Sequence, residues 1–464
     1  MGETNVSGIR LGFNGSVRVC GLGLRISADG GGLLLRELDD ALGLTEGVAS
    51  ELEDERSRAR FGTSELLRLR VYLLALGYGA QSDSDLLRDD PALRLAVSDG
   101  RGLRPLERAL ASQPTLSRFT RQLSSEAGRE TLERGLVASS LAGRKLCGSG
   151  SGRLTLDIDS LPIPAHGLQG GSDYNGHYRR RCFHPQVVMD GSGHFLAVKL
   201  RPGNESTSAG ATESLGRLID RLNDAGERVG RVRGDAGFRS ESLFHALEER
   251  NVGYVFRLLN NSKLDRLAEP LLVRPPGRRP KEPREWTYVM RYRAQRWSRE
   301  RRIVLVVQER PDDLYLHHFF LVTSDETTTG RQVLSVYRKR GTMEGRLGEW
   351  MHVLAPTLSS SHRDGECVGP EDDTPFQVNA ATLLMNALAY NLLHTLRSLA
   401  AKARIGRIGT ALGLGRARRL LLSVAGRLIV SARKAAMLVP SLAAEMWSTV
   451  LARIRHRARV AGLA

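Results

Sequence analysis

Cysteine is scarce in this chain, and the few cysteines are widely separated. Only four occur in 464 residues, and no two of them form a CxxC pair. Their positions are Cys20, Cys147, Cys182 and Cys367. A thiolate zinc site and a disulfide framework both depend on characteristic cysteine spacings, so the sequence indicates neither.

Long apolar runs are also missing. The first 16 residues lack the apolar core of a signal peptide. Three basic residues interrupt the most apolar stretch, 420–439, and Pro440 closes it. This pattern predicts an amphipathic helix and not a membrane span. We therefore expect a soluble cytoplasmic protein, associated with the nucleoid and without a membrane partner.

Acidic residues are outnumbered by basic ones. The chain has 51 Asp and Glu against 68 Lys and Arg, a net charge of +17. Most of the positive charge is Arg, which binds phosphates in a forked geometry and stacks on bases better than Lys does. This balance favours a polyanionic partner, with nucleic acid ahead of a membrane surface. The alternative is a generic basic protein from a GC-rich genome, in which Arg is also frequent.

At this length we expect two or three domains, and residues 1–147 are predicted to form a helical DNA-binding domain. Within it, Ser112 is a candidate helix cap and Pro114 fits a first helical turn. A capped turn followed by Thr, Ser and Arg is typical of a helix-turn-helix that meets DNA. Such turns also occur in ordinary helical bundles, which is the alternative. The candidate DNA contacts are Thr115, Ser117 and Arg118.

A Gly/Ser-rich linker at 148–152 precedes a region of alternating strands and helices. Strand-like runs near 154–159, 182–189 and 194–200 come first, and helix–strand pairs follow. The last helix is predicted to span 328–352. Three strands, helix, strand, helix, strand, helix is the order of a ribonuclease-H-like fold. Such a fold has an antiparallel meander on one side of the sheet, and the later strands are added parallel to it.

The predicted catalytic core has two parts, separated by an insertion. Residues 153–259 form the first part and residues 318–398 the second. Residues 260–317 combine a Pro/Arg-rich stretch with β-like alternation and are predicted to be a β-rich insertion. Residues 399–464 are predicted to be a basic helical C-terminal region. The expected fold class is an α/β ribonuclease-H-like catalytic core with a β-rich insertion, flanked by N-terminal and C-terminal helical regions.

A dense basic stripe marks the beginning of that C-terminal region. Its members are Lys402, Arg404, Arg407, Arg416, Arg418, Arg419, Arg427, Arg433 and Lys434. Acids that would balance these charges are absent from the stripe, which favours phosphate binding over a merely solvated face.

The run 154–159 alternates apolar and polar residues, which predicts a strand with one buried face. Asp157 and Asp159 then lie on the same face, because successive side chains point to opposite sides. Two adjacent carboxylates repel each other unless a positive group is near. A bound metal ion is one such group. The alternative is a solvated edge strand with two ordinary surface acids.

Three acids lie at positions where the predicted fold can bring their side chains together. Asp159 ends the first strand, Asp235 ends the fourth, and Glu344 lies on the final helix. The first and fourth strands are neighbours in a ribonuclease-H-like sheet, so the three carboxylates are expected to meet. An oxygen-only site of this kind suits Mg²⁺ or Mn²⁺, with two ions promoting an in-line phosphoryl displacement. Tyr337 and Arg340 share a helical face with Glu344, where they can contact DNA; an ordinary surface Arg–Glu pair is the alternative.

The chain resembles bacterial insertion-sequence transposases of the DDE type, specifically the group called transposase DDE domain group 1. The resemblance runs from about residue 30 to 440, and its motifs occur in the same order. The matching segments are Leu86–Pro91, Ser112–Phe119, Asp157–Ser160, His166–Gln169, Leu200–Asn204, Arg233–Phe238 and the Tyr337, Arg340 and Glu344 signature.

This resemblance implies a metal-binding catalytic triad of Asp159, Asp235 and Glu344, with Asp157 as the fallback for the first acid. It also implies a tryptophan in the insertion that stacks on a flipped DNA base. Trp297 is the main candidate for this role and Trp286 a second, although a tryptophan in a β-rich segment is more often part of a core.

Two positions depart from the family pattern. Leu161 stands where Thr is common, and Met351 stands where related transposases often carry Lys; Arg346 or Arg338 can replace the missing cation. The resemblance implies a cut-and-paste transposase that acts as a homodimer on the inverted repeats of its element and on target DNA. Two rival hypotheses are a catalytically degenerate transposase that acts as a DNA-binding repressor, and a ribonuclease-H-like nuclease without strand transfer.

Overall fold

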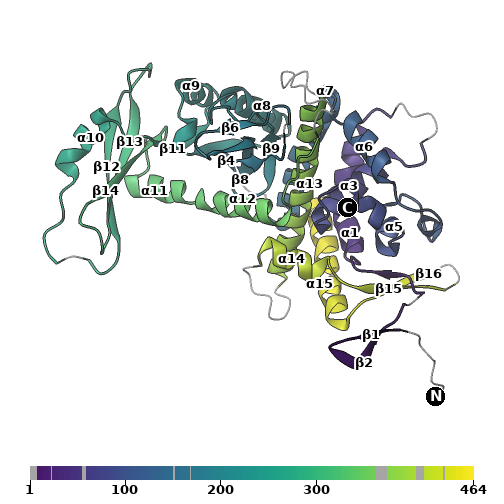
Figure 1. Ribbon diagram of the computed structural model, residues 1–464. Helices are drawn as coiled ribbons and strands as arrows, with labels where there is room; N and C mark the ends of the chain where they lie inside the picture. The colour runs from purple at the N-terminus through teal and green to yellow at the C-terminus, as the bar shows by residue number, and fades with distance from the viewer. Residues whose placement is uncertain are drawn as a thin grey trace.

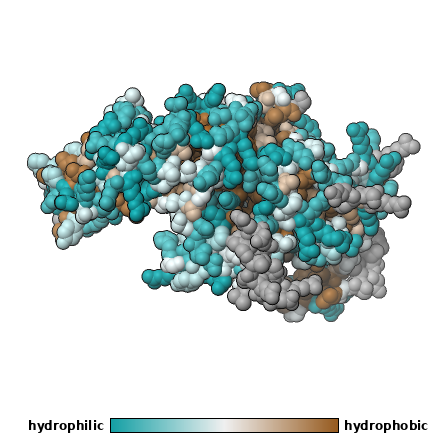
Figure 2. Space-filling model, turned by 90° about the horizontal axis from the view of Figure 1, so that it is seen from above, coloured by the Kyte–Doolittle hydropathy of each residue, from teal (hydrophilic) through white to brown (hydrophobic). Residues whose placement is uncertain are grey.

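One eight-stranded mixed sheet forms the centre of the fold, and helices from both ends of the chain gather beside it (Figure 1). The surface seen from above is predominantly hydrophilic, with apolar residues in separate patches (Figure 2). The computed structural model describes residues 8–21, 23–54, 59–149, 152–167, 169–278, 280–360, 374–403, 412–431 and 434–463.

The central sheet has the strand order β12-β13-β14-β11-β10-β4-β8-β9. β4 pairs antiparallel with β8 and parallel with β10, and β10 pairs parallel with β11. The expected meander is therefore confirmed, and β10 and β11 run parallel to β4 as expected. The prediction is wrong for the last strand, because β14 pairs antiparallel with β11. β4 lies inside the sheet, so the edge-strand alternative is wrong. The bounds of the six strands of this sheet outside residues 260–316 are β4 Leu154–Ser160, β8 Gln186–Asp190, β9 Phe195–Lys199, β10 Val229–Gly234, β11 Gly253–Leu258 and β14 His317–Thr323.

Two amphipathic helices connect the later strands of this sheet. α8 (Ala211–Asp224) joins β9 to β10, and α9 (Glu241–Glu249) joins β10 to β11, with the short 3-10 helix η2 (Ala236–Phe238) before α9. Each buries an apolar stripe in one core with the sheet, because its apolar residues recur at helical spacing. These elements agree with the order expected from the sequence.

Residues 260–317 extend the central sheet and do not form a separate unit. After α10 (Ser262–Ala268) and the 3-10 helix η3 (Glu269–Leu271), strands β12 (Arg284–Tyr292) and β13 (Arg301–Glu309) follow. β13 pairs with β14 along seven residue pairs. The predicted β-like segments are therefore present, and they share the core that lies beneath β4 and β10.

A small three-stranded sheet lies beside the main one. It consists of β5 (Ile163–Pro164), β6 (Asp173–Asn175) and β7 (Arg180–Phe183) in the order β5-β7-β6. The single strand predicted over 182–189 is wrong: the run is divided between β7 and β8. The break comes at Pro185, which has no N–H to continue a ladder.

The N-terminal region is mainly helical but begins with strands that the sequence did not predict. β1 and β2 form a hairpin, and β3 pairs with a strand of the C-terminal region. The elements are β1 Ile9–Leu11, β2 Asn14–Val19, β3 Ile26–Ser27, α1 Gly32–Leu42, α2 Leu44–Ser50, α3 Thr63–Leu76, α4 Asp83–Leu86, α5 Pro91–Val97, the 3-10 helix η1 Arg104–Glu107, α6 Gln113–Gln122 and α7 Glu126–Cys147.

The C-terminal region contains α13 Thr374–Lys402, α14 Leu414–Leu421, β15 Gly426–Ser431, β16 Lys434–Leu438 and α15 Ser441–Ala461. The amphipathic helix predicted over 420–439 is wrong, because β15 and β16 form a hairpin there. β15 finds a second partner in β3, a contact between the two ends of the chain that local periodicity does not reveal. Arg404, Arg407 and Arg433 of the basic stripe lie outside the described residues. No helix in the described ranges has the length and apolarity needed to cross a membrane.

The helix predicted over 328–352 is two helices, α11 (Gly330–Arg338) and α12 (Gly341–Val353). Lys339 and Arg340 between them keep right-handed helical angles, and a glycine follows directly. The two helices cross from the insertion to the helices of the N-terminal and C-terminal regions, which together are called the helical scaffold (Figure 1).

The side chain of Asn391 bonds helix α13 of the C-terminal region to the backbone of β9, the edge strand of the main sheet. Asn391 on α13 accepts a hydrogen bond from the backbone N–H of Phe195 at 2.8 Å and donates to its carbonyl at 2.9 Å. It also donates to Ser139 Oγ on α7 at 3.0 Å. The buried amide therefore replaces the strand that would otherwise pair with the backbone of β9 at this point.

We expect Asn391→Leu to lower the free energy of unfolding by about 2–4 kcal/mol, because it leaves a buried N–H and a buried C=O of Phe195 without partners. Urea denaturation measures this loss. Ser398→Ala, about two turns further along α13, removes only a hydrogen bond to the helix's own backbone and serves as the control. Equal stabilities of the two variants would contradict the stabilising role of the Asn391 side chain at the edge of the sheet.

Candidate active site

The two predicted aspartates lie at the same edge of the central sheet. Asp159 is the next-to-last residue of β4, and Asp235 directly follows β10. The strands are adjacent and parallel, with Asp157 opposite Arg233. The register therefore brings Asp159 and Asp235 to neighbouring positions where the strands end. The Asp235 side chain also accepts the N–H of Gly237 at 2.9 Å, which fixes the turn after the strand.

Arg340 links the third predicted acid to the first. Its guanidinium donates to Asp159 Oδ2 at 2.6 Å and to Glu344 Oε1 at 2.6 Å. Arg340 is 7% exposed, and its Nε has no partner, so the two carboxylates hold the group. The predicted Arg–Glu pair is thus part of a three-residue bridge, in which Arg340 is buried and the Glu344 side chain remains 61% exposed.

The environment of Asp159 makes its carboxyl less acidic than usual. Burial raises the pKa of Asp159 to about 6, and the carboxylates of Asp235 and Glu344 add to this rise, while Arg340 opposes it. Burial works against the charge on Arg340, but Asp159, Asp235 and other neighbours outweigh it and raise its pKa. The three carboxylates and the arginine therefore form one electrostatic cluster.

Asp157, the fallback residue, is already neutralised by a partner of its own. Both of its oxygens accept from Arg233, Oδ1 from Nε and Oδ2 from Nη2, each at 2.6 Å. Asp157 is 2% exposed. Arg233 also donates to the carbonyl of Val336 at 2.8 Å, which connects the sheet to α11. The geometry therefore gives Asp157 a structural place and leaves Asp159, with a side chain that is 14% exposed, as the more accessible acid of the strand.

The chemistry of the three acids fits a hard divalent cation, because every donor is a carboxylate oxygen. Within the described ranges, no three Asp, Glu, His or Cys side chains are grouped closely enough to hold a metal ion. In this arrangement the guanidinium of Arg340 bridges Asp159 and Glu344 in place of an inorganic cation.

Tyr337 and Tyr178 border the cluster. Burial raises the pKa of Tyr337, and the charges of Asp235 and Glu344 contribute to the rise. Burial likewise raises the pKa of Tyr178, with Asp159 and Asp235 as the next causes. Sequence reasoning identified Tyr337 but missed Tyr178, which comes from the small sheet. The sequence signal for Tyr178 is weak. It lies in a run of aromatic and basic residues after Gly170 and Gly171 and before the strand predicted near 182–189.

The expected role of Trp297 is not compatible with its position. Its ring is 8% exposed and packs against Phe244 and Tyr292, with the Arg301 guanidinium 5.2 Å from its centroid. The side chain is part of the core and is not free to stack on a DNA base. Trp286 is only partly buried against the same core.

The candidate DNA contacts on α6 differ from one another in their accessibility. Ser112 precedes the helix but makes no capping hydrogen bond with its side chain. The Ser117 hydroxyl binds the side chain of Gln81, Thr115 lines a cavity, and Arg118 is exposed beside it.

The two departures from the family pattern lie outside the carboxylate cluster. Leu161 is 9% exposed, and Met351 is partly buried; both pack in the core shared by the helical scaffold and the small sheet. Neither residue contributes a charge to the cluster.

Residues 9–459 match the family model for the transposase DDE domain group 1. No curated protein matches the chain. Among solved structures, the chain is similar to the piggyBac transposase in a synaptic complex with hairpin DNA, determined by cryo-EM. The TM-score is 0.42 and the identity 13%, over 84% of this chain and 79% of that chain. Because the family model spans nearly the whole sequence, this protein belongs to the transposase DDE domain group 1 family.

Proposed function

We propose that this transposase binds the terminal inverted repeats of its own mobile element, cleaves the element ends, and joins the freed 3′-hydroxyls to target DNA. The observation that supports this proposal best is the cluster of Asp159, Asp235 and Glu344 around Arg340. Carboxylates from two adjacent strand ends and a crossing helix are what metal-dependent phosphoryl transfer requires. We place the reaction in the cytoplasm, at the nucleoid.

Asp159, Asp235 and Glu344 are the residues that would hold Mg²⁺ or Mn²⁺, with two ions expected. Three negative charges face one positive charge on Arg340, so the cluster retains a charge that suits divalent cations. When bound, the ions would activate a water or 3′-hydroxyl and stabilise the leaving oxygen. If its carboxylate partners were engaged elsewhere, the forked guanidinium of Arg340 would be able to pair with a DNA phosphate. Tyr337, on the preceding helix, is the second expected DNA contact at this site.

Arg340→Gln tests whether this guanidinium competes with the metal. In the absence of metal, we expect the variant to melt at a lower temperature than wild type, because Asp159 and Glu344 lose their shared counter-ion. The rise in Tm on adding Mg²⁺ should be larger than in wild type, since no cation has to be displaced. Arg338→Gln, at an exposed arginine paired with Glu285, is the matched control. An equal Mg²⁺-induced rise in all three proteins would refute the competition.

A second basic site supports DNA binding by the N-terminal helices. Arg60 precedes α3, Arg88 follows α4, and Arg118 lies on α6, and together they line a cavity of about 660 Å³. None of the three forms an ion pair with a described acidic residue. Unpaired arginines that converge on one hollow suit the phosphates of a duplex. Thr115 lines the same hollow, whereas Ser117 is engaged by Gln81.

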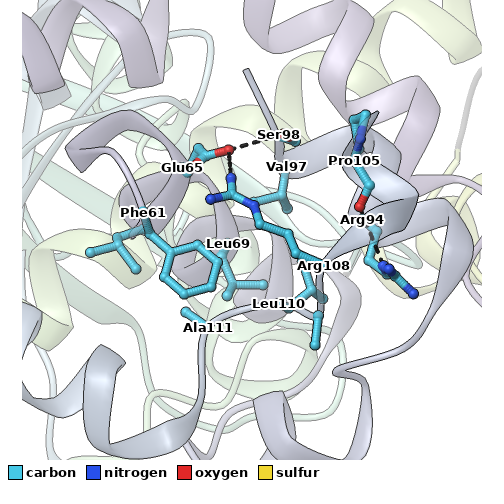
Figure 3. Close-up of a pocket in the computed structure, with 12 residues that line it drawn as sticks. Phe61, Glu65, Leu69, Arg94, Val97, Ser98, Pro105, Arg108, Leu110 and Ala111 are labelled. Carbon is cyan, nitrogen blue, oxygen red and sulfur yellow. Dashed lines mark hydrogen bonds and ion pairs between the residues drawn. The ribbon is translucent and has the colours of Figure 1, made fainter. Parts of the chain in front are cut away.

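A neighbouring arginine shows the contrast. Arg108 is paired with Glu65 and lies over the ring of Phe61, 4.7 Å from the guanidinium carbon to the ring centroid (Figure 3). Glu65 also accepts from the Ser98 hydroxyl at 3.0 Å. Arg108 therefore serves the packing of the domain, whereas the three arginines of the hollow form no ion pair with an acid among the described residues, and Arg60 only lies 5.6 Å from the Phe61 ring centroid.

Replacing Arg60, Arg88 and Arg118 by Ala should weaken binding to duplex DNA of any sequence. The slope of log K against log salt should fall by about 0.9 for each lost phosphate contact, or about 2.7 for the triple variant. Fluorescence anisotropy at several salt concentrations measures both quantities. Arg101→Ala removes an exposed arginine of the same region that lies outside the hollow, and it should leave the slope unchanged. A wild-type slope in the triple variant would exclude the hollow as a DNA site.

Both ends of an element must be cut together, so we expect the active unit to be a homodimer on DNA. Met351 keeps one alternative open, since the usual cation is absent there: a degenerate transposase that binds element ends only as a repressor. The other alternative is a nuclease that cuts but does not join strands. The products of one reaction separate the three possibilities.

The test is cleavage of a duplex that carries the element's own ends, with Mg²⁺, Mn²⁺ or EDTA. We expect wild type to cut at the element boundary and to join the ends to a second duplex only with metal. Asp235→Asn should bind the duplex with similar affinity but lose cutting, because one metal-binding carboxylate is gone. Binding without cutting under every condition would establish the repressor, and cutting without joining would establish the nuclease.

A further inference from the structure

The turn between β6 and β7 brings an aromatic and basic segment to the catalytic carboxylates. Residues 176–180 read Gly-His-Tyr-Arg-Arg. β7 pairs with β5, which follows β4 in the chain, and leads into β8, which pairs with β4 at Asp159. The turn is thus tied on both sides to the strand that carries the first catalytic acid.

A buried asparagine fixes the shape of this turn. Asn175 Oδ1 accepts the N–H groups of His177 at 3.0 Å and of Tyr178 at 3.2 Å. Its Nδ2 donates to the carbonyl of Gly203 at 2.7 Å, and the side chain is 8% exposed. The Tyr178 ring packs edge-on against His177 and His184, with centroids 4.8 and 5.7 Å away. The backbone and the tyrosine ring are therefore held in place before any ligand arrives.

The residue after this tyrosine has an unfavourable backbone conformation. Arg179 has a φ of 53°, in the left-handed region that L-residues other than Gly, Asn and Asp seldom adopt. A glycine would occupy this position without steric cost. Backbone strain of this kind persists where the surrounding structure enforces it, and it is concentrated at functional sites.

The polar side-chain ends of three residues in the turn, Tyr178, Arg179 and Arg180, have no partner among the described residues. Arg179 and Arg180 are exposed and form no ion pair with a described acid. The Tyr178 hydroxyl has no hydrogen bond to any residue in the described ranges, although the side chain is half-buried beside Asp159 and Asp235. In contrast, Arg181 donates to the hydroxyl of Ser172 at 3.4 Å. Two free cations and one free hydroxyl donor thus flank the carboxylates on the side of the small sheet.

We propose that the β6–β7 turn is a grip for the scissile DNA strand, in which the Tyr178 hydroxyl donates to a non-bridging oxygen of the scissile phosphate and Arg179 and Arg180 hold the adjoining phosphates. The proposal rests on the proposed transposase function and adds a contact from the small sheet to those expected from Tyr337 and Arg340. Phosphate oxygens accept from both hydroxyls and guanidiniums, and these contacts carry no sequence information. The grip therefore acts equally on both element ends and on target DNA.

The first test compares two tyrosines of the same hairpin. Tyr178→Phe keeps the ring but removes the hydroxyl, and we expect the single-turnover cleavage rate to fall about 100-fold, the scale for one lost donor to a reacting oxyanion. Affinity for the duplex and the Tm should stay at wild-type values. Tyr174→Phe, 62% exposed on β6, is the control and should cut at the wild-type rate.

The second test uses the strained residue. Arg179→Gly relieves the backbone, so the Tm should rise, while the slope of log K against log salt for a duplex should fall by about 0.9 because one phosphate contact is lost. A structural role alone predicts the higher Tm with an unchanged slope, and that result would overturn the grip. Cutting by Tyr178→Phe at the wild-type rate would overturn it as well. If wild type itself does not cut with Mg²⁺ or Mn²⁺, the proposed function fails instead.

Discussion

The structure depends on the neutralisation of buried carboxylates by arginine. β4 carries two aspartates on one face in the interior of a sheet, where an unpaired charge is costly. Arg233 binds Asp157 from the adjacent strand, and Arg340 binds Asp159 from the crossing helix. These two pairs fix the register of β4 with β10 and the place where α12 crosses the strand ends. The proposed metal-binding acids thus have their positions because the chain must neutralise the charges on β4.

The same requirement extends into the scaffold. Asp190, at the end of β8, is fully buried and accepts from Arg144 on α7 at 3.0 Å. The Arg144 guanidinium and the hydrogen bonds of Asn391 join the meander to α7 and α13. DNA held by the N-terminal helices would therefore be positioned relative to the carboxylates through buried polar contacts, which are more directional than apolar packing.

Much of the catalytic sheet could be predicted from the sequence, because its strands and helices alternate with clear periodicity. The order of the strands and the adjacency of Asp159 and Asp235 followed from that pattern. The β15–β16 hairpin could not be predicted, since its third strand, β3, lies about 400 residues away in the sequence. The sequence could not predict that Arg340 bridges two carboxylates. A helical pattern shows the spacing of Arg340 and Glu344, but it does not show that Asp159 on the sheet lies beside them. The core position of Trp297 depends on neighbours from three separate segments, namely Phe244, Tyr292 and Arg301.

Strands β12 and β13 continue the catalytic sheet and bury their apolar residues in its core. This continuity limits how the family can vary in length. Removing the segment as a block would expose the edge of β14 and open the core, so evolutionary deletions are expected to be rare there. Variation is expected instead in the turns at the far end, such as 310–316, where residues are exposed and no core is lost. The distal end can thus acquire new surface while the chemistry of the carboxylates stays the same.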